Sequence, residues 1–228
     1  MKLILTHEMK IIIGIIIFIG ILCVVEWCSN NDDYEYIHKI LLDNLEKTLT
    51  IFEKHNIQYW ASGGTLLGAI REGKIIEHDD DIDLSMFEDD FLKLQNNENN
   101  IQNDLNDIGL HLLISEPELY HNKIVSKRKD NNYYKNKIFI DIMSVEKEGN
   151  RYILDTNAYG PNVGDGEGFW GNEWFYEKHL LPLSTHEFSN MIINIPKNPF
   201  NYLERTYGDW KTPVKQHNHL HEINLQID

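Results

Sequence analysis

Apolar residues form one long block near the N-terminus of the chain. Every residue in Ile11–Val25 is apolar or glycine, and Met9–Cys28 is interrupted only by Lys10 and Glu26. This length approaches the ~20 residues with which an α-helix crosses a bilayer. We therefore expect residues 1–30 to form an N-terminal membrane anchor.

The charges on either side of this block predict its orientation. Lys2 and Lys10 precede it, whereas Glu26, Asp32 and Asp33 follow it. Because basic residues stay on the cytosolic side, we expect a cytosolic N-terminus and a lumenal or extracytoplasmic domain. A cleaved signal peptide is the alternative, although no A-x-A-like cleavage site follows the apolar run.

A helical pattern begins after the polar stretch 29–33, which we interpret as a linker. Apolar residues recur there with the spacing of an amphipathic helix, at Ile37, Leu41, Leu45, Leu49 and Phe52. The short apolar run Ile57–Ala61 then predicts a strand. We expect one globular domain at residues 34–213, followed by a polar tail at 214–228.

A glycine pair follows that strand and precedes a second helix. Gly63 and Gly64 predict a turn, after which Thr65 can cap a helix that runs to about Arg71. Backbone N–H groups at a helix N-terminus bind phosphate well, and Arg71 can reach the same phosphate. A plain turn and an ion-paired arginine are the alternatives.

The strand predicted at Ile82–Met86 presents two aspartates on one face. Asp81 and Asp83 alternate with apolar residues, so their carboxylates project side by side. Asp141, inside a second apolar run, can supply a third carboxylate, and a charge buried there requires a metal or cation partner. One or two Mg²⁺ or Mn²⁺ ions can join such carboxylates to phosphate oxygens. A solvated acidic turn at residues 79–81 is the alternative.

The remaining patterns predict an α+β fold with a mixed β-sheet flanked by helices. Strands are expected at Leu110–Ile114, Lys123–Ser126, Lys137–Val145 and Tyr152–Leu154, and short helices at Glu88–Leu94 and Pro199–Tyr207. The asparagine-rich stretch Asn96–Asn106 and the glycine-dense stretch Tyr159–Asn172 are expected to be loops.

Composition narrows the classes of partner. The 228 residues carry a formal net charge of −15, so the chain lacks the basic surface that nucleic acids require. Nucleic acid is therefore not expected as a partner. Both cysteines, Cys23 and Cys28, lie in or beside the apolar block, which excludes a disulfide framework or a cysteine zinc site in the domain.

Three segments of the chain resemble the LicD and fukutin family. They are YWASGGTLLGAIREGKIIEHDDDIDLSM (residues 59–86), FIDIMSV (139–145) and YLERTYGDW (202–210). The resemblance spans about residues 37–213. It implies a nucleotidyltransferase-superfamily fold, preceded here by the expected membrane helix. It also implies transfer of a phosphorylated group, such as phosphocholine or ribitol phosphate, from a CDP-activated donor to a hydroxyl of a glycan or glycoprotein.

The resemblance also implies roles for individual residues. Asp81, Asp83 and Asp141 would be catalytic metal ligands, with Asp141 also acting as the base. Residues 63–65 would form the turn on the phosphate side. The expected mechanism is in-line displacement at phosphorus, with one or two divalent ions neutralising the pyrophosphate.

A family lysine and two departures from the family pattern complete this comparison. Lys123 corresponds to a lysine that contacts substrate, although Lys127 fits the same pattern equally well. His78 stands where the family usually has tryptophan, and residues 76–77 read Ile-Glu instead of Ile-Pro. The cysteine-rich zinc insert of some animal members is missing.

Two other functions fit part of the pattern. In a metal-dependent glycosyltransferase, residues 81–83 would be a D-x-D motif, but the glycine pair and Asp141 would then have no role. The other alternative is a non-catalytic, membrane-tethered glycan-binding module. His217, His219 and His221 alternate in the tail and form a weaker candidate for a metal site.

Overall fold

The computed structural model describes residues 7–114, 122–126, 138–155 and 173–213, without the side chains of 7–14 and 19–33. Its first element, α1 (His7–Lys54), is one continuous helix. The linker expected at residues 29–33 is therefore wrong. That stretch is polar but contains neither glycine nor proline, so the helix continues through it at a modest cost in propensity.

The structure does not support the expected membrane anchor. Within the part of the chain that the structure describes, no helix is both long enough and apolar enough to cross a bilayer. Most side chains of residues 1–30 lie outside that part. The location of the domain stays a prediction.

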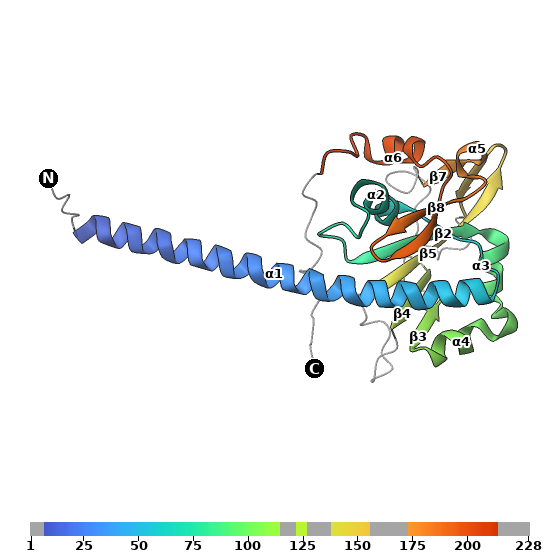
Figure 1. The fold of residues 1–228 in the computed structure, drawn as a ribbon, viewed down its shortest axis with the longest axis horizontal. Helices are drawn as coiled ribbons and strands as arrows, with labels where there is room; N and C mark the ends of the chain where they lie inside the picture. Colours follow the sequence, from blue (N-terminus) through green and yellow to red (C-terminus); the bar gives the residue numbers. More distant parts are fainter. Residues whose placement is uncertain (1–6, 115–121, 127–137, 156–172, 214–228) are drawn as a thin grey trace.

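The second half of α1 belongs to the core of the domain. Figure 1 shows the first half projecting away from the domain and the second half lying along it. Ile37, Leu41, Leu45 and Phe52 are fully buried, as the spacing predicts, whereas Leu49 is only partly buried. Because α1 packs against strands β2, β4 and β5, which are described below, it closes one side of the sheet.

The other elements are short. In chain order they are β1 (Trp60–Ala61), α2 (Gly63–Glu72), β2 (Asp81–Phe87), α3 (Glu88–Gln95), the 3₁₀ turn η1 (Glu98–Asn100), α4 (Ile101–Asp107), β3 (Leu110–Leu113), β4 (Asn122–Ser126), β5 (Phe139–Glu148), β6 (Arg151–Leu154), β7 (Trp174–Tyr176), α5 (Glu177–Leu180), β8 (Ser184–Phe188), β9 (Met191–Ile195) and α6 (Phe200–Tyr207). The α+β class with a mixed sheet is confirmed.

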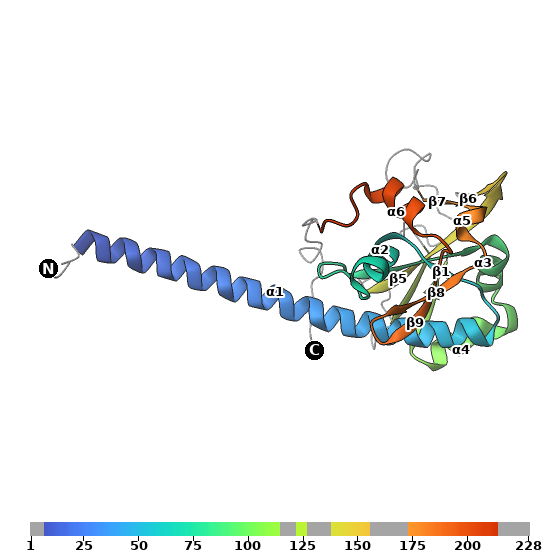
Figure 2. The same ribbon diagram turned by 45° about the horizontal axis from the view of Figure 1, so that its top comes forward.

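The main sheet is organised around β5. Its strands lie in the order β1-β2-β5-β4-β3, and β6 joins the far half of β5 to β7. β2 and β5 are parallel, whereas the other pairs of this sheet are antiparallel. Strands β8 and β9 form a separate hairpin, which packs beside β1 and α2 (Figure 2). β5 therefore places its side chains between those of β2 and β4.

Several predicted elements differ from the structure. The loop expected at Asn96–Asn106 is wrong, because η1 and α4 occupy it and α4 buries Ile101 and Leu105. β1 is shorter than the predicted strand, and no pattern predicted β7, α5 or the β8–β9 hairpin. The whole glycine-dense stretch 159–172 and the whole tail 214–228, with its three histidines, lie outside the described residues.

The packing of α1 predicts unequal effects of two leucine substitutions. Leu45→Ala removes a fully buried side chain, so the unfolding free energy should fall by about 2–5 kcal/mol. Leu49→Ala is the matched control and should cost clearly less, because Leu49 is only partly buried. Urea unfolding followed by circular dichroism measures both. Equal losses would show that the second half of α1 is not packed as described.

Candidate active site

Three neighbouring strands bring the predicted acidic residues and one lysine together. Asp83 on β2 is in register with Asp141 on β5, and Asp141 is in register with Lys123 on β4. Residues in register on adjacent strands project to the same face of a sheet, and Asp81 lies two residues before Asp83. The four side chains therefore share one face at the centre of the sheet.

The carboxylates of this group lie close enough to share a cation. Oxygen atoms of Asp81, Asp83 and Asp141 all lie within 4.8 Å of one another. Lys123 Nζ donates a hydrogen bond to Asp141 Oδ1 at 2.6 Å and lies 3.2 Å from the centroid of the Phe139 ring. Lys127, the alternative lysine, lies outside the described residues. Lys123 is thus in direct contact with the carboxylate group, and its choice over Lys127 stays a prediction.

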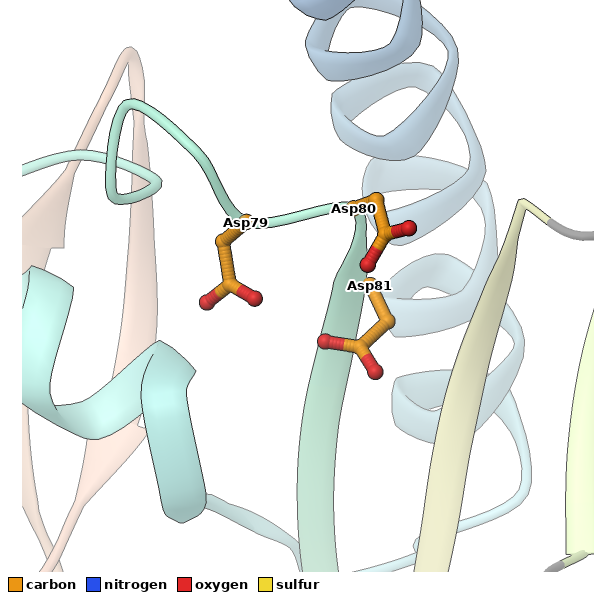
Figure 3. Close-up of side chains that lie close together, drawn as sticks. All are labelled: Asp79, Asp80 and Asp81. Carbon is orange, nitrogen blue, oxygen red and sulfur yellow. The ribbon is translucent and has the colours of Figure 1, made fainter. Parts of the chain in front are cut away.

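A second acidic group adjoins the first. Asp79, Asp80 and Asp81 also have oxygen atoms within 4.8 Å of one another. Figure 3 shows Asp79 and Asp80 on the segment that leads into β2, with Asp81 at the start of the strand and the three carboxylates close together. The acidic turn is thus continuous with the group on the sheet, and Asp81 belongs to both.

Crowding of like charges changes the acidity of the group. Burial raises the pKa of Asp81 well above its ordinary value, and the charges of Asp83 and Asp141 raise it further. Burial and the charge of Asp141 raise the pKa of Asp83 in the same way. Burial raises the pKa of Asp79 as well, and Asp81 adds to the effect. Such a group is poorly stable as a set of free anions and favours a bound cation.

The glycine turn holds Asp83 in place. Helix α2 begins at Gly63, whose φ is +49°, and not at a Thr65 cap as predicted. The Gly64 N–H donates to Asp83 Oδ2 at 2.8 Å, and the Asp83 N–H donates to Thr65 Oγ1 at 2.8 Å. The Gly63 N–H donates to the Tyr202 hydroxyl at 3.0 Å. The donors that were expected to face a phosphate are therefore bonded within the protein.

Both glycines are required by close approach to carboxylates. A Cβ on Gly63 would lie 2.2 Å from Asp83 Oδ2, and a Cβ on Gly64 would lie 2.5 Å from Asp79 Oδ2. Neither distance can accommodate a side chain without movement of an aspartate. The backbone of the turn therefore packs directly against the acidic group.

Arg71 lies at the other end of α2 and is bonded elsewhere. Its guanidinium forms an ion pair with Glu72 at 2.7 Å and donates to the Trp210 carbonyl at 3.4 Å. These contacts join α2 to the segment after α6. The structure does not bring Arg71 into the carboxylate group, and its contact with phosphate stays a prediction.

Sequence reasoning missed a buried pair behind the glycine turn. The Tyr202 hydroxyl donates to Glu173 Oε1 at 2.5 Å, and both residues are buried. Burial raises the pKa of the Glu173 carboxyl to about 7, against the opposing effects of the Tyr202 hydrogen bond and the Arg205 charge. Tyr202 opens the third motif, and Glu173 directly precedes an aromatic run. An acidic residue next to aromatic residues was the available signal.

A cavity of about 320 Å³ lies on the α1 side of the acidic turn. Tyr34 and His38 from α1, and Lys74, Ile75 and Glu77 from the segment after α2, line part of it. His38 Nε2 is hydrogen-bonded to the Asp79 carbonyl at 2.8 Å, which ties α1 to the acidic turn. Burial lowers the pKa of His38. The residues that line the cavity do not include the carboxylates of the site.

A comparison with known families decides the relationship of the chain. Residues 56–198 match the model of the family described as LicD/FKTN/FKRP, nucleotidyltransferase domain. The chain belongs to this family. The match covers β1, α2, β2 and β5, which carry the acidic group and its glycine turn.

Relatives of this LicD/FKTN/FKRP domain are bacterial and animal proteins. Uncharacterized protein RP689 of Rickettsia prowazekii is 30% identical over 92% of this chain and 76% of its own length. Ribitol-5-phosphate transferase FKTN of Homo sapiens is 28% identical over 78% of this chain. The chain spans only 34% of that human protein. Among solved structures, the crystal structure of ANT(2")-Ia in complex with adenylyl-2"-tobramycin is similar over 54% of this chain and 56% of the ANT(2")-Ia chain. The sequence identity is 16% and the TM-score is 0.31.

The buried Lys123–Asp141 pair predicts a large loss on substitution of the lysine. Lys123→Met leaves the Asp141 carboxylate uncompensated among other carboxylates, so the unfolding free energy in chelator should fall by about 3–5 kcal/mol. Adding Asp141→Asn to Lys123→Met should recover most of the lost unfolding free energy. Lys147→Met breaks an exposed pair with Glu177 and, as the control, should leave the unfolding free energy almost unchanged. Equal losses of unfolding free energy in Lys123→Met and Lys147→Met would contradict the buried contact between Lys123 and Asp141.

Glu173→Gln is expected to remove part of the pH dependence of stability. The folded protein keeps a proton on Glu173 up to about pH 7, whereas the unfolded chain releases it near 4.5. The stability that the proton on Glu173 contributes is fully present below pH 4.5 and is lost as the pH rises through about 7. Between these two pH values the unfolding free energy of the wild type should fall by on the order of 3 kcal/mol relative to that of Glu173→Gln.

Urea unfolding at a series of pH values, with chelator present, measures this difference. Glu204→Gln, on an exposed position of α6, is the matched control and should follow the wild type. If the unfolding free energies of the wild type and Glu173→Gln depend on pH in the same way, Glu173 does not hold a proton in the folded state.

Proposed function

We propose that this domain transfers a phosphorylated group, such as phosphocholine or ribitol phosphate, from a CDP-activated donor to a glycan hydroxyl and releases CMP. The observation that carries the proposal is the group formed by Asp81, Asp83 and Asp141, whose carboxylates lie within 4.8 Å of one another on one face of the sheet. The family match supports a phosphotransferase-type role in glycan modification in general terms.

The acidic group is suited to a divalent cation. Its donors are carboxylate oxygens, which are the ligands that Mg²⁺ and Mn²⁺ prefer. Burial, and after it the mutual repulsion of these carboxylates, raises the pKa values of Asp81 and Asp83, which supports the same assignment. When bound, such an ion would neutralise charge on the donor's pyrophosphate. Asp81, Asp83 and Asp141 are the proposed ligands.

Residues of the chain then position and deprotonate the acceptor. We assign Asp141 as the carboxylate that takes the proton of the acceptor hydroxyl, while Lys123 balances its charge and holds Oδ1 in place. The glycine turn keeps Asp83 Oδ2 fixed through the Gly64 N–H. Fixed charges aimed at a reacting phosphoryl group lower the barrier without reorganisation during the reaction.

The substrate is inferred from the relatives and needs a direct test. The human relative is called a ribitol-5-phosphate transferase, and this chain spans about a third of it. The purified full chain, with Mg²⁺ or Mn²⁺, is to be incubated with glycan acceptors and a panel of CDP-, UDP- and GDP-linked donors. Release of CMP from a CDP-linked donor supports the proposal. Release of UDP or GDP would instead favour the D-x-D glycosyltransferase.

Asp83→Asn should abolish this reaction while leaving the fold intact. Loss of one charged ligand at a reacting phosphoryl group is expected to lower the rate of CMP release by at least ~100-fold. Asp89→Asn, at an exposed position on α3, is the matched control and should keep the wild-type rate. Quantification of released nucleotide by chromatography measures both. An active Asp83→Asn variant would exclude the proposed metal site.

A further inference from the structure

A chain of hydrogen bonds leads from a buried carboxyl group to the acidic site. Glu173 Oε1 accepts from the Tyr202 hydroxyl at 2.5 Å, and that hydroxyl accepts from the Gly63 N–H at 3.0 Å. The next N–H, of Gly64, donates to Asp83 Oδ2 at 2.8 Å. Glu173 and Tyr202 are thus connected to Asp83 through two successive peptide groups.

The glycine turn is confined on both sides. On one side, the backbone of Gly63 lies so close to Asp83 that a Cβ there would be 2.2 Å from Oδ2. On the other side, the Tyr202 hydroxyl holds the Gly63 N–H. The turn can therefore neither approach Asp83 nor withdraw from it without breaking a contact.

A purely structural role does not readily account for Glu173. Its side chain is buried, and a buried carboxyl group costs free energy unless it has polar partners. Tyr202 already packs well, because its ring stacks on Phe175 with centroids 4.6 Å apart. A tyrosine hydroxyl needs only one acceptor, which a backbone carbonyl can supply without burying an ionisable group. Glu173 instead places an acceptor 2.5 Å from the Tyr202 hydroxyl and so fixes this hydroxyl beside the Gly63 N–H.

We propose that Glu173 and Tyr202 are positioning residues, which hold the Gly63–Gly64 turn and thereby fix the Asp83 carboxylate for binding a divalent cation. This inference rests on the metal site of the proposed function. Partners that orient a metal ligand from behind typically change metal affinity by about 10–100-fold when they are lost. α6, which is distant in sequence, would thus control the geometry of the site.

The test is Mn²⁺ binding by the full chain, measured by isothermal titration and by the Mn²⁺ electron paramagnetic resonance spectrum. Tyr202→Phe and Glu173→Leu should each weaken Mn²⁺ binding by at least ~10-fold and change the spectrum of the bound ion. Glu173→Gln should keep the wild-type affinity, because its amide oxygen still accepts from Tyr202. These measurements need neither donor nor acceptor.

Tyr59→Phe is the matched control for the loss of a buried hydroxyl group. Tyr59 is buried like Tyr202, and its hydroxyl is hydrogen-bonded to the backbone of Asn194. This variant should lose some stability and keep its Mn²⁺ affinity. If Tyr202→Phe and Tyr59→Phe bind Mn²⁺ with the same affinity, the role of Tyr202 is structural and the inference is overturned.

The outcomes separate this inference from the proposed function. If Tyr202→Phe and Glu173→Leu bind Mn²⁺ as tightly as the wild type, the positioning role is overturned and the metal site stays in place. A wild-type chain that binds no Mn²⁺ overturns the metal site and the inference together. Weak binding in Tyr202→Phe that Glu173→Gln does not share supports the inference even if no CMP is released in the donor assay.

Discussion

Mutual repulsion between carboxylates is the constraint on which the rest of this domain depends. The parallel pairing of β2 and β5 puts Asp83 beside Asp141, and the alternation of β2 adds Asp81 on the same face. Like charges opposite each other destabilise a sheet, and burial increases the cost. The fold therefore has to provide cations and hydrogen-bond donors at this place, which explains the positions of the surrounding elements.

Each segment around the acidic group meets this demand in a different way. β4 supplies Lys123, whose ion pair with Asp141 balances one charge. The start of α2 supplies the Gly64 N–H to Asp83, and glycine is needed because a Cβ would collide with the carboxylates. α6 supplies Tyr202, which holds the turn from behind. The charge that remains is the reason for which we propose a divalent cation at this site.

Local patterns in the sequence predicted the elements whose stability is local. The spacing of apolar residues identified the second half of α1, and strict alternation identified β2 with its two aspartates facing one way. Elements that depend on distant packing escaped prediction. The asparagine-rich stretch reads as a loop, yet α4 forms there because Ile101 and Leu105 are buried against the core. The β8–β9 hairpin likewise buries Phe188 and Ile193.

The sequence by itself determined the chemistry of the site, because residue types and their spacing are local properties. It named Asp81, Asp83, Asp141 and the glycine pair, and it indicated the family that the comparison then confirmed. Only the tertiary structure decided which groups meet. Register between strands chose Lys123 as the partner of Asp141, and the return of α6 to the glycine turn brought Tyr202 behind Asp83, where it meets Glu173 from the residue before β7. Such contacts join residues far apart in the chain, and their formation depends on the packing of the whole domain, which no local pattern encodes.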